Sequence, residues 1–108
     1  MRPSSRTIAA CTALALAGLA GAAAAQGAPT ADQTRYLAAN CANCHGTDGR
    51  SAGGTPGLAG LSSAYFIEQM KAFKEGKRPA TIMHQLAKGY SDEQIAALAA
   101  YFSRQSAR

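Results

Sequence analysis

The stretch Cys41-Ala42-Asn43-Cys44-His45 determines the expected fold and chemistry of this chain. Its two cysteines stand three positions apart, so on a helical turn their sulfurs project in the same direction. A C-x-x-C-H sequence is typical of covalent c-type haem attachment, in which both thiols bond to vinyl groups on one haem edge and the imidazole reaches the iron. The motif occurs once. It therefore predicts one covalent haem c held by Cys41 and Cys44, with His45 as an axial iron ligand.

Two other roles are open to a C-x-x-C pair. A thioredoxin-like redox couple belongs to a βαβ setting that the sequence does not predict. A zinc site needs more ligands than His45 and His84 supply. The composition also favours a cofactor: the chain has no Trp, four Tyr and three Phe, and it is rich in Ala and Gly. In so small a domain, side chains of this kind fill a core poorly, and a cofactor often completes it.

Outward from the motif, capping residues and apolar spacing predict helices and no strand. We expect them at 32–40, from 62 or 63 to about 75, at 82–88, and from 92 onward. Between the first two lies a loop, since 46–60 holds six glycines and a proline. The fold class predicted is all-α. The side chains expected to be buried are Tyr36 and Leu37 in the first helix, Phe66, Met70 and Phe73 in the second, and Ile95, Leu98 and Phe102 in the last.

Capping residues define the ends of these helices. Thr30 or Asp32 is expected to cap the first helix, and Gly76 to end the second. Ser91 and Gln94 form a capping-box pattern at the start of the last helix. These signals fix where the chain can turn.

The second axial ligand has several candidates. Met70 lies on an apolar stripe, so we interpret it as a core residue. Met83 follows Gly76 and Pro79, which leave room for the chain to return across the other haem face, and we predict it as the ligand. His84 is the alternative; it would give a bis-histidine centre of lower potential, and we favour a surface position for it. An open iron position, which permits small-ligand binding or peroxidase chemistry, is the third possibility.

Pro56 in the glycine-rich loop has a candidate role at the metal. A ligating histidine usually donates its second ring nitrogen to a carbonyl or carboxylate, which fixes the orientation of the ring. The carbonyl of Pro56 is a candidate acceptor for His45. The alternative is that Pro56 only turns the loop.

The first 25 residues have the order of a cleaved secretory signal peptide. Arg2 and Arg6 precede an apolar run from 8 to 19, and small residues follow at 21–25. The run is shorter than the roughly 20 apolar residues of a spanning helix. We expect cleavage after Ala25, export to the periplasm, and one domain at 26–108. A lipoprotein box ending at Cys11 is the alternative; otherwise Cys11 leaves with the signal.

The charge of the exported chain argues against nucleic acid as a partner. Without Arg2 and Arg6, nine of the 11 basic residues remain, against six acidic residues. No run of more than two consecutive Lys and Arg residues occurs. No segment after residue 25 is apolar enough to span a membrane. Lys71, Lys74 and Arg78 recur at helical spacing and form either a docking rim for an acidic redox partner or a solvated helix face.

With these motifs, the chain resembles the class I cytochromes c over its whole predicted mature length. The resemblance rests on C41-A-N-C-H-G46, P56-G-L-A-G60, the segment 65–76, and A80-T-I-M83 followed by 87–102. It implies three main helices around one covalently bound haem and makes 26–108 a cytochrome c domain. It also implies Met83 as the distal ligand and places the Pro56 carbonyl near the proximal histidine, His45.

Within that family, A80-T-I-M83 with A87-K-G-Y-S91 is similar to the monohaem cytochrome subunit of flavocytochrome c sulfide dehydrogenase and to related small periplasmic cytochromes. The resemblance implies a periplasmic one-electron carrier, not an enzyme, that accepts electrons from a flavoprotein which oxidises sulfide. A free-standing soluble cytochrome c serving an oxidase or another dehydrogenase is the alternative. A haem enzyme or gas sensor with open iron is the third hypothesis.

Overall fold

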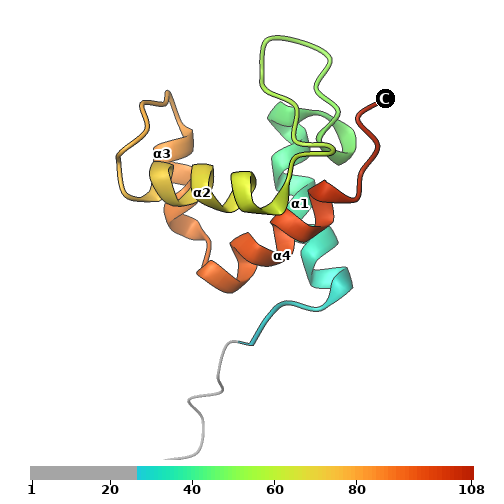
Figure 1. Cartoon of the computed structure of the whole chain (residues 1–108), viewed down its shortest axis with the longest axis horizontal. Helices are drawn as coiled ribbons and strands as arrows, with labels where there is room; N and C mark the ends of the chain where they lie inside the picture. The colour runs from blue at the N-terminus through green and yellow to red at the C-terminus, as the bar shows by residue number, and fades with distance from the viewer. Residues whose placement is uncertain (1–26) are drawn as a thin grey trace, which may run out of the picture.

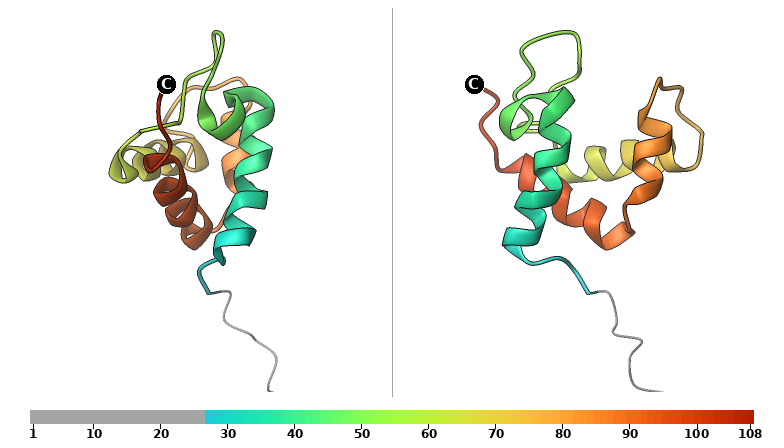
Figure 2. Two further views of the ribbon diagram at one scale, coloured as in Figure 1. Left: turned by 90° about the vertical axis from the view of Figure 1, so that its right-hand side faces the viewer. Right: turned by 180° about the vertical axis from the view of Figure 1, so that it is seen from behind.

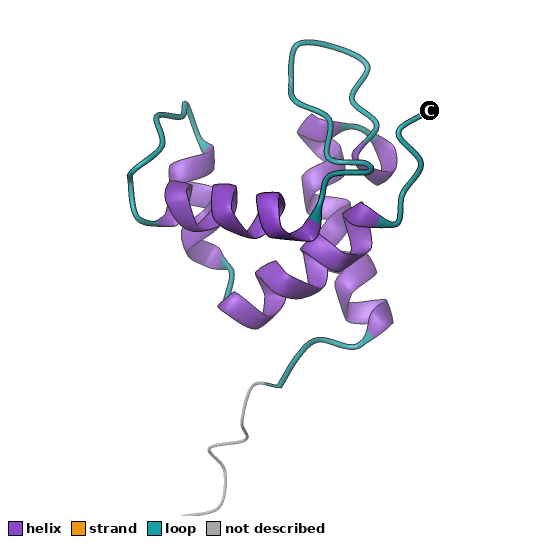
Figure 3. Ribbon diagram, in the orientation of Figure 1, coloured by secondary structure: helices purple, strands orange, loops and turns teal. Residues whose placement is uncertain are grey.

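The computed structural model describes residues 27–108, so the predicted signal peptide lies outside the described residues. The described chain is helical and contains no strand (Figure 3). The all-α prediction is therefore confirmed. The elements in chain order are α1 (Ala31–His45), the 3₁₀ turn η1 (Thr47–Gly49), α2 (Ser63–Lys74), α3 (Met83–Leu86), the 3₁₀ turn η2 (Ala87–Gly89) and α4 (Asp92–Ser103).

The predicted capping signals operate in the structure. Thr30 accepts a hydrogen bond from the backbone N–H of Gln33 at 3.2 Å, while the Gln33 side chain accepts one from the Thr30 N–H at 2.9 Å. Ser91 and Gln94 form the same reciprocal box at the start of α4. A cap of this kind stabilises a helix by about 1 kcal/mol. Gly76 follows the end of α2 with φ 71°, as a C-terminal glycine should.

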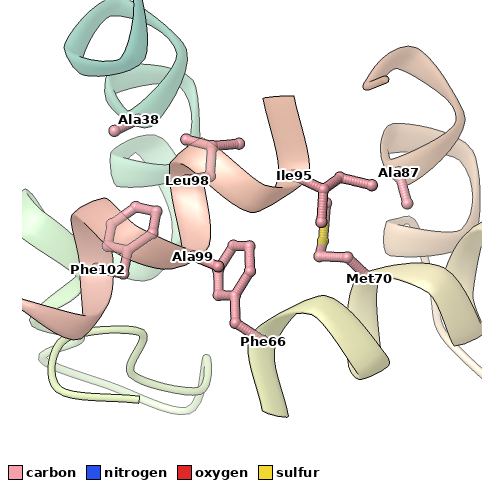
Figure 4. Close-up of a cluster of buried hydrophobic side chains, with 8 residues drawn as sticks. All are labelled: Ala38, Phe66, Met70, Ala87, Ile95, Leu98, Ala99 and Phe102. Carbon is pink, nitrogen blue, oxygen red and sulfur yellow. The ribbon is translucent and has the colours of Figure 1, made fainter. Parts of the chain in front are cut away.

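The core is small and lies mostly between α2 and α4 (Figure 4). In the close-up, Met70 of α2 points toward Ile95 of α4, and Phe66 lies beside Ala99. The rings of Phe66 and Phe102 stack with centroids 5.7 Å apart. The burial predicted for the apolar residues of α2 and α4 is confirmed, except that Phe73 is only partly buried. The buried apolar residues are Ala38, Phe66, Met70, Ala87, Ile95, Leu98, Ala99 and Phe102.

One burial prediction is wrong. Tyr36 is 79% exposed, and its neighbour Leu37 is only partly buried. The reason is that α1 turns Thr34 and Ala38, one helical turn apart, toward the interior. Tyr36 is two residues from both Thr34 and Ala38 and therefore lies on the opposite side of the helix, facing solvent.

The arrangement of the helices positions the ends of α1 and α3. Helices α2 and α4 pack together, α1 packs against α4, and α3 packs against α2. Seen from the front (Figure 1) and from behind (Figure 2, right), α1 and α3 stand at opposite ends of the α2–α4 pair. The C-terminal end of α1 and the short α3 extend to the same side of that pair. Among residues 27–108 no helix combines the length and apolarity that a membrane crossing requires.

Candidate functional site

The C-x-x-C-H motif forms the last turns of α1, where the sequence had predicted a helix ending at residue 40. The helix continues to His45, and the N–H of Gly46 closes it on the carbonyl of Ala42 at 3.1 Å. Cys41 is partly buried and Cys44 is exposed. Residues three apart on a helix share a face, so both sulfurs are presented on one side of α1.

The properties of Cys41 disfavour a redox couple of the thioredoxin type. Burial raises the pKa of the Cys41 thiol above its usual range. A C-x-x-C nucleophile needs the opposite shift, because the thiolate is the reactive form. The zinc alternative also lacks support: residues 27–108 hold no group of three or more Cys, His, Asp or Glu side chains that could bind a metal ion.

The imidazole of His45 contacts the backbone of the glycine-rich loop. Its Nδ1 lies 2.6 Å from the carbonyl oxygen of Pro56. A carbonyl oxygen only accepts hydrogen bonds, so Nδ1 carries the proton and donates it. In the neutral ring this leaves Nε2 with a free lone pair, which is the atom a metal ion requires.

Glycines bring the loop close enough for this contact. Gly46 has φ 82°, and a Cβ there would lie 2.1 Å from the carbonyl oxygen of Arg50. Gly49 has φ 77°, and its carbonyl accepts hydrogen bonds from the N–H groups of Leu58 at 2.8 Å and Ala59 at 3.1 Å. The loop therefore folds back on itself, and its Pro56 carbonyl lies beside the His45 ring.

The candidate distal residues separate clearly in the structure. Met83 is the first residue of α3 and is partly buried against the core. Met70 is 6% exposed within the core, as predicted. His84 differs from the expected surface position: it is partly buried, and its Nδ1 is buried without a hydrogen-bond partner among the described residues. The turn of α3 that places Met83 against the core also draws His84 inward.

Comparison with known proteins agrees with this geometry. The model of the cytochrome c family matches residues 31–106.

The chain belongs to the cytochrome c family. The family implies covalently bound haem c, and the homologues found are electron-transfer cytochromes. The class I cytochrome c fold predicted from the sequence is confirmed. The family also implies a redox protein as partner.

Two similar proteins are cytochromes. The chain is 44% identical over 51 residues to cytochrome c-554(548) of Halomonas halodenitrificans, a match covering 44% of this chain and 61% of that protein. It is also similar to the structure of cytochrome c4 from Acidithiobacillus ferrooxidans, with 44% identity and a TM-score of 0.56, covering 58% of this chain and 37% of that one. The chain thus spans less than two thirds of the length of either relative.

The site residues of this cytochrome fit haem c. Two thiols lie on one face of a helix end, the more exposed of them being Cys44. The imidazole of His45 has its Nδ1 engaged and its Nε2 free. A soft thioether at Met83 suits iron as a further ligand. No second C-x-x-C-H sequence occurs in the chain.

Sequence reasoning missed two features of this cytochrome. Lys71 and Lys74, interpreted as either a docking rim or a solvated helix face, both pair with Asp92, at 4.0 and 3.7 Å, and Lys74 also donates to the carbonyl of Tyr90 at 2.6 Å. Arg78 lies over the ring of Phe73 at 4.7 Å. The pairing of the lysines with Asp92 could not be predicted, because no local sequence pattern links residues 71 and 74 to residue 92. The second feature is a hydrogen bond from Tyr101 to Asp48.

Proposed function

We propose that this cytochrome is a periplasmic one-electron carrier with a single haem c, bound covalently by Cys41 and Cys44 and ligated by His45 and Met83. The observation that carries the proposal is the 2.6 Å contact between His45 Nδ1 and the Pro56 carbonyl. That contact selects the tautomer in which Nε2 can bind iron, directly beside the two thiols on α1. Residues 26–108 form the cytochrome domain, and residues 1–25 the cleaved export signal.

Each residue has a separate task. Cys41 and Cys44 anchor the group to the end of α1, and His45 is oriented by Pro56. Met83 approaches from α3, which stands apart from α1 across the α2–α4 pair (Figure 1). When bound, haem c supplies a single-electron couple between ferric and ferrous iron. Cys41 and Met83 both pack against the apolar core, which would exclude water from that side of the haem.

The attachment is tested on the exported protein. We expect mass spectrometry to give the chain from near Gln26 plus the mass of one haem, and the haem to stay with the protein through denaturing electrophoresis and acid–acetone extraction. Thioether bonds survive both treatments, whereas coordination alone does not. Potentiometric titration should show a single one-electron step. A haem that extracts freely, or a zinc ion in its place, contradicts the proposal.

A finer proposal concerns the electron donor. The A80-T-I-M83 and A87-K-G-Y-S91 segments favour a flavoprotein sulfide dehydrogenase, in which this chain is the haem subunit. Two structural observations support a stable subunit over a transient carrier. Ile82 and Leu86, on either side of Met83, are 56% and 46% exposed. Lys71 and Lys74, which would steer a transient partner, share the carboxylate of Asp92, and this offsets part of their positive charge.

Purification from the native host tests the donor. A stable subunit should bury an apolar patch within a total interface of roughly 1,200–2,000 Å², and its association should tolerate salt. We expect co-elution with a flavin-containing polypeptide at high ionic strength, with sulfide reducing the haem. A transient carrier would instead show electron-transfer rates that fall steeply with ionic strength. Elution alone, with no faster reduction by sulfide when the flavoprotein fraction is added, identifies the free-standing carrier.

A further inference from the structure

Asp48 links the loop after His45 to the last helix. Its backbone lies in the left-handed region with φ 52°, the only described residue other than glycine to do so. Its Oδ1 accepts a hydrogen bond of 2.7 Å from the hydroxyl of Tyr101, in the last turn of α4. This hydrogen bond is the main cause that raises the pKa of Tyr101, so the hydroxyl stays protonated and remains a donor. Two segments 53 residues apart in sequence are joined by it.

Further contacts hold the same loop at both of its ends. Arg50 reaches the other carboxylate oxygen of Asp48 at 3.4 Å, and its Nε donates to the carbonyl of Ser106 at 2.8 Å. At the far end of the loop, the N–H of Gly60 donates to the carbonyl of Phe102 at 2.9 Å. Both ends of the segment from 48 to 60 are therefore attached to the last turn of α4 and the residues that follow it.

The attachment extends to the carbonyl that contacts His45. Gly49, next to Asp48, accepts hydrogen bonds from Leu58 and Ala59, so residues 58 and 59 follow any displacement of residue 49. Pro56 lies two residues before Leu58, the nearer of the two residues that donate to Gly49. A shift at Asp48 is thus transmitted through Gly49, Leu58 and Gly57 to the Pro56 carbonyl, which lies 2.6 Å from His45 Nδ1.

We infer that Asp48 and Tyr101 are positioning residues for His45, holding the 46–60 loop against α4 so that the Pro56 carbonyl stays at hydrogen-bond distance from the imidazole. The inference rests on the proposed function, in which His45 ligates the iron. A strong hydrogen bond at Nδ1 makes the ring a more basic ligand, and a more basic ligand favours ferric over ferrous iron. Loosening the loop should therefore raise the reduction potential.

Tyr101→Phe in the holoprotein tests this directly. The substitution removes the hydroxyl and keeps the ring, which packs edge-on against Phe102 with centroids 5.1 Å apart. We expect a higher reduction potential, seen as a several-fold lower ferric-to-ferrous ratio at a fixed solution potential. The His45 Nδ1 proton in the ferrous protein should shift in NMR spectra and exchange faster with solvent.

Matched variants separate positioning from other effects. Asp48→Ala should shift both measurements in the same direction, and the Tyr101→Phe/Asp48→Ala double variant should shift them no further than the larger single change. Asp48→Asn should restore most of the wild-type behaviour, since its amide oxygen accepts the same hydrogen bond and asparagine tolerates a positive φ. Tyr36→Phe removes a hydroxyl from a side chain that is 79% exposed and should change nothing.

Two results would overturn the inference. In the first, Tyr101→Phe lowers the melting temperature but leaves the potential and the Nδ1 proton unchanged, which assigns the contact to fold stability alone. In the second, Asp48→Asn shifts the potential as far as Asp48→Ala, which assigns the effect to charge. Failure of the proposed function is distinguishable, because the wild-type protein would then lack a His45-ligated haem spectrum altogether.

Discussion

Replacing both Cys41 and Cys44 by alanine is expected to leave the chain largely unfolded. Among residues 27–108, only Phe102, Ile95 and Leu98 are large side chains that are fully buried, and three of the eight buried apolar residues in that range are alanines. A core of this size is marginal for a domain of about 80 residues. Haem is the largest apolar body available to it, so its binding free energy contributes directly to folding.

Far-ultraviolet circular dichroism of the haem-free double variant measures this effect. We expect most of the helical signal to be lost, and no haem to remain after acid–acetone extraction. Cys11→Ala is the matched control, since Cys11 is predicted to leave with the signal peptide and its replacement should leave the exported protein unchanged. A haem-free variant with native helix content and a cooperative thermal transition would show that the side-chain core is sufficient by itself.

The elements of the fold were predictable where local signals were strong. The capping boxes at Thr30 and Ser91 and the stripe through Ile95 and Leu98 are short-range patterns, and the structure reproduces them. The C-terminal end of α1 was not predicted, because the C-A-N-C-H residues have no strong helix preference. Their helical conformation is completed by Gly46, which closes the last turn.

Contacts between distant segments were beyond the reach of such patterns. The exposure of Tyr36 depends on which narrow strip of α1 meets α4. The pairing of Lys71 and Lys74 with Asp92 depends on how α2 packs on α4. The same holds for Asp48 and Tyr101. The contact of Pro56 was partly predictable. A histidine ligand usually needs a hydrogen-bond acceptor for its second ring nitrogen, so the sequence could propose the Pro56 carbonyl but could not give the distance.

Met83→Ala is expected to have the second large effect, on the iron. A thioether sulfur is a weak ligand that favours ferrous over ferric iron. Its loss should lower the reduction potential by a sizeable part of the roughly 0.8 V range that axial ligands control. The ferric protein should lose its weak far-red sulfur-to-iron band, and the iron should become open to carbon monoxide in the ferrous state and to cyanide in the ferric state.

Met70→Ala is the matched control for this experiment. Met70 is the other methionine among residues 27–108 and is 6% exposed in the core between α2 and α4 (Figure 4). Its truncation should cost about 2–5 kcal/mol in the free energy of unfolding. The far-red band should stay in place. The two variants therefore separate loss of a ligand from loss of packing.

His84 defines the remaining alternative, because its buried Nδ1 has no partner among the described residues and it adjoins Met83. With Met83 as ligand, His84→Ala should retain the far-red band and a potential close to that of the wild type. If the wild-type spectrum instead lacks the band and has bis-histidine features that disappear in His84→Ala, His84 is the ligand. If the band survives loss of Met83 and disappears with Met70, the helix α2 supplies the sulfur. Either outcome moves the distal ligand away from Met83, the first residue of α3.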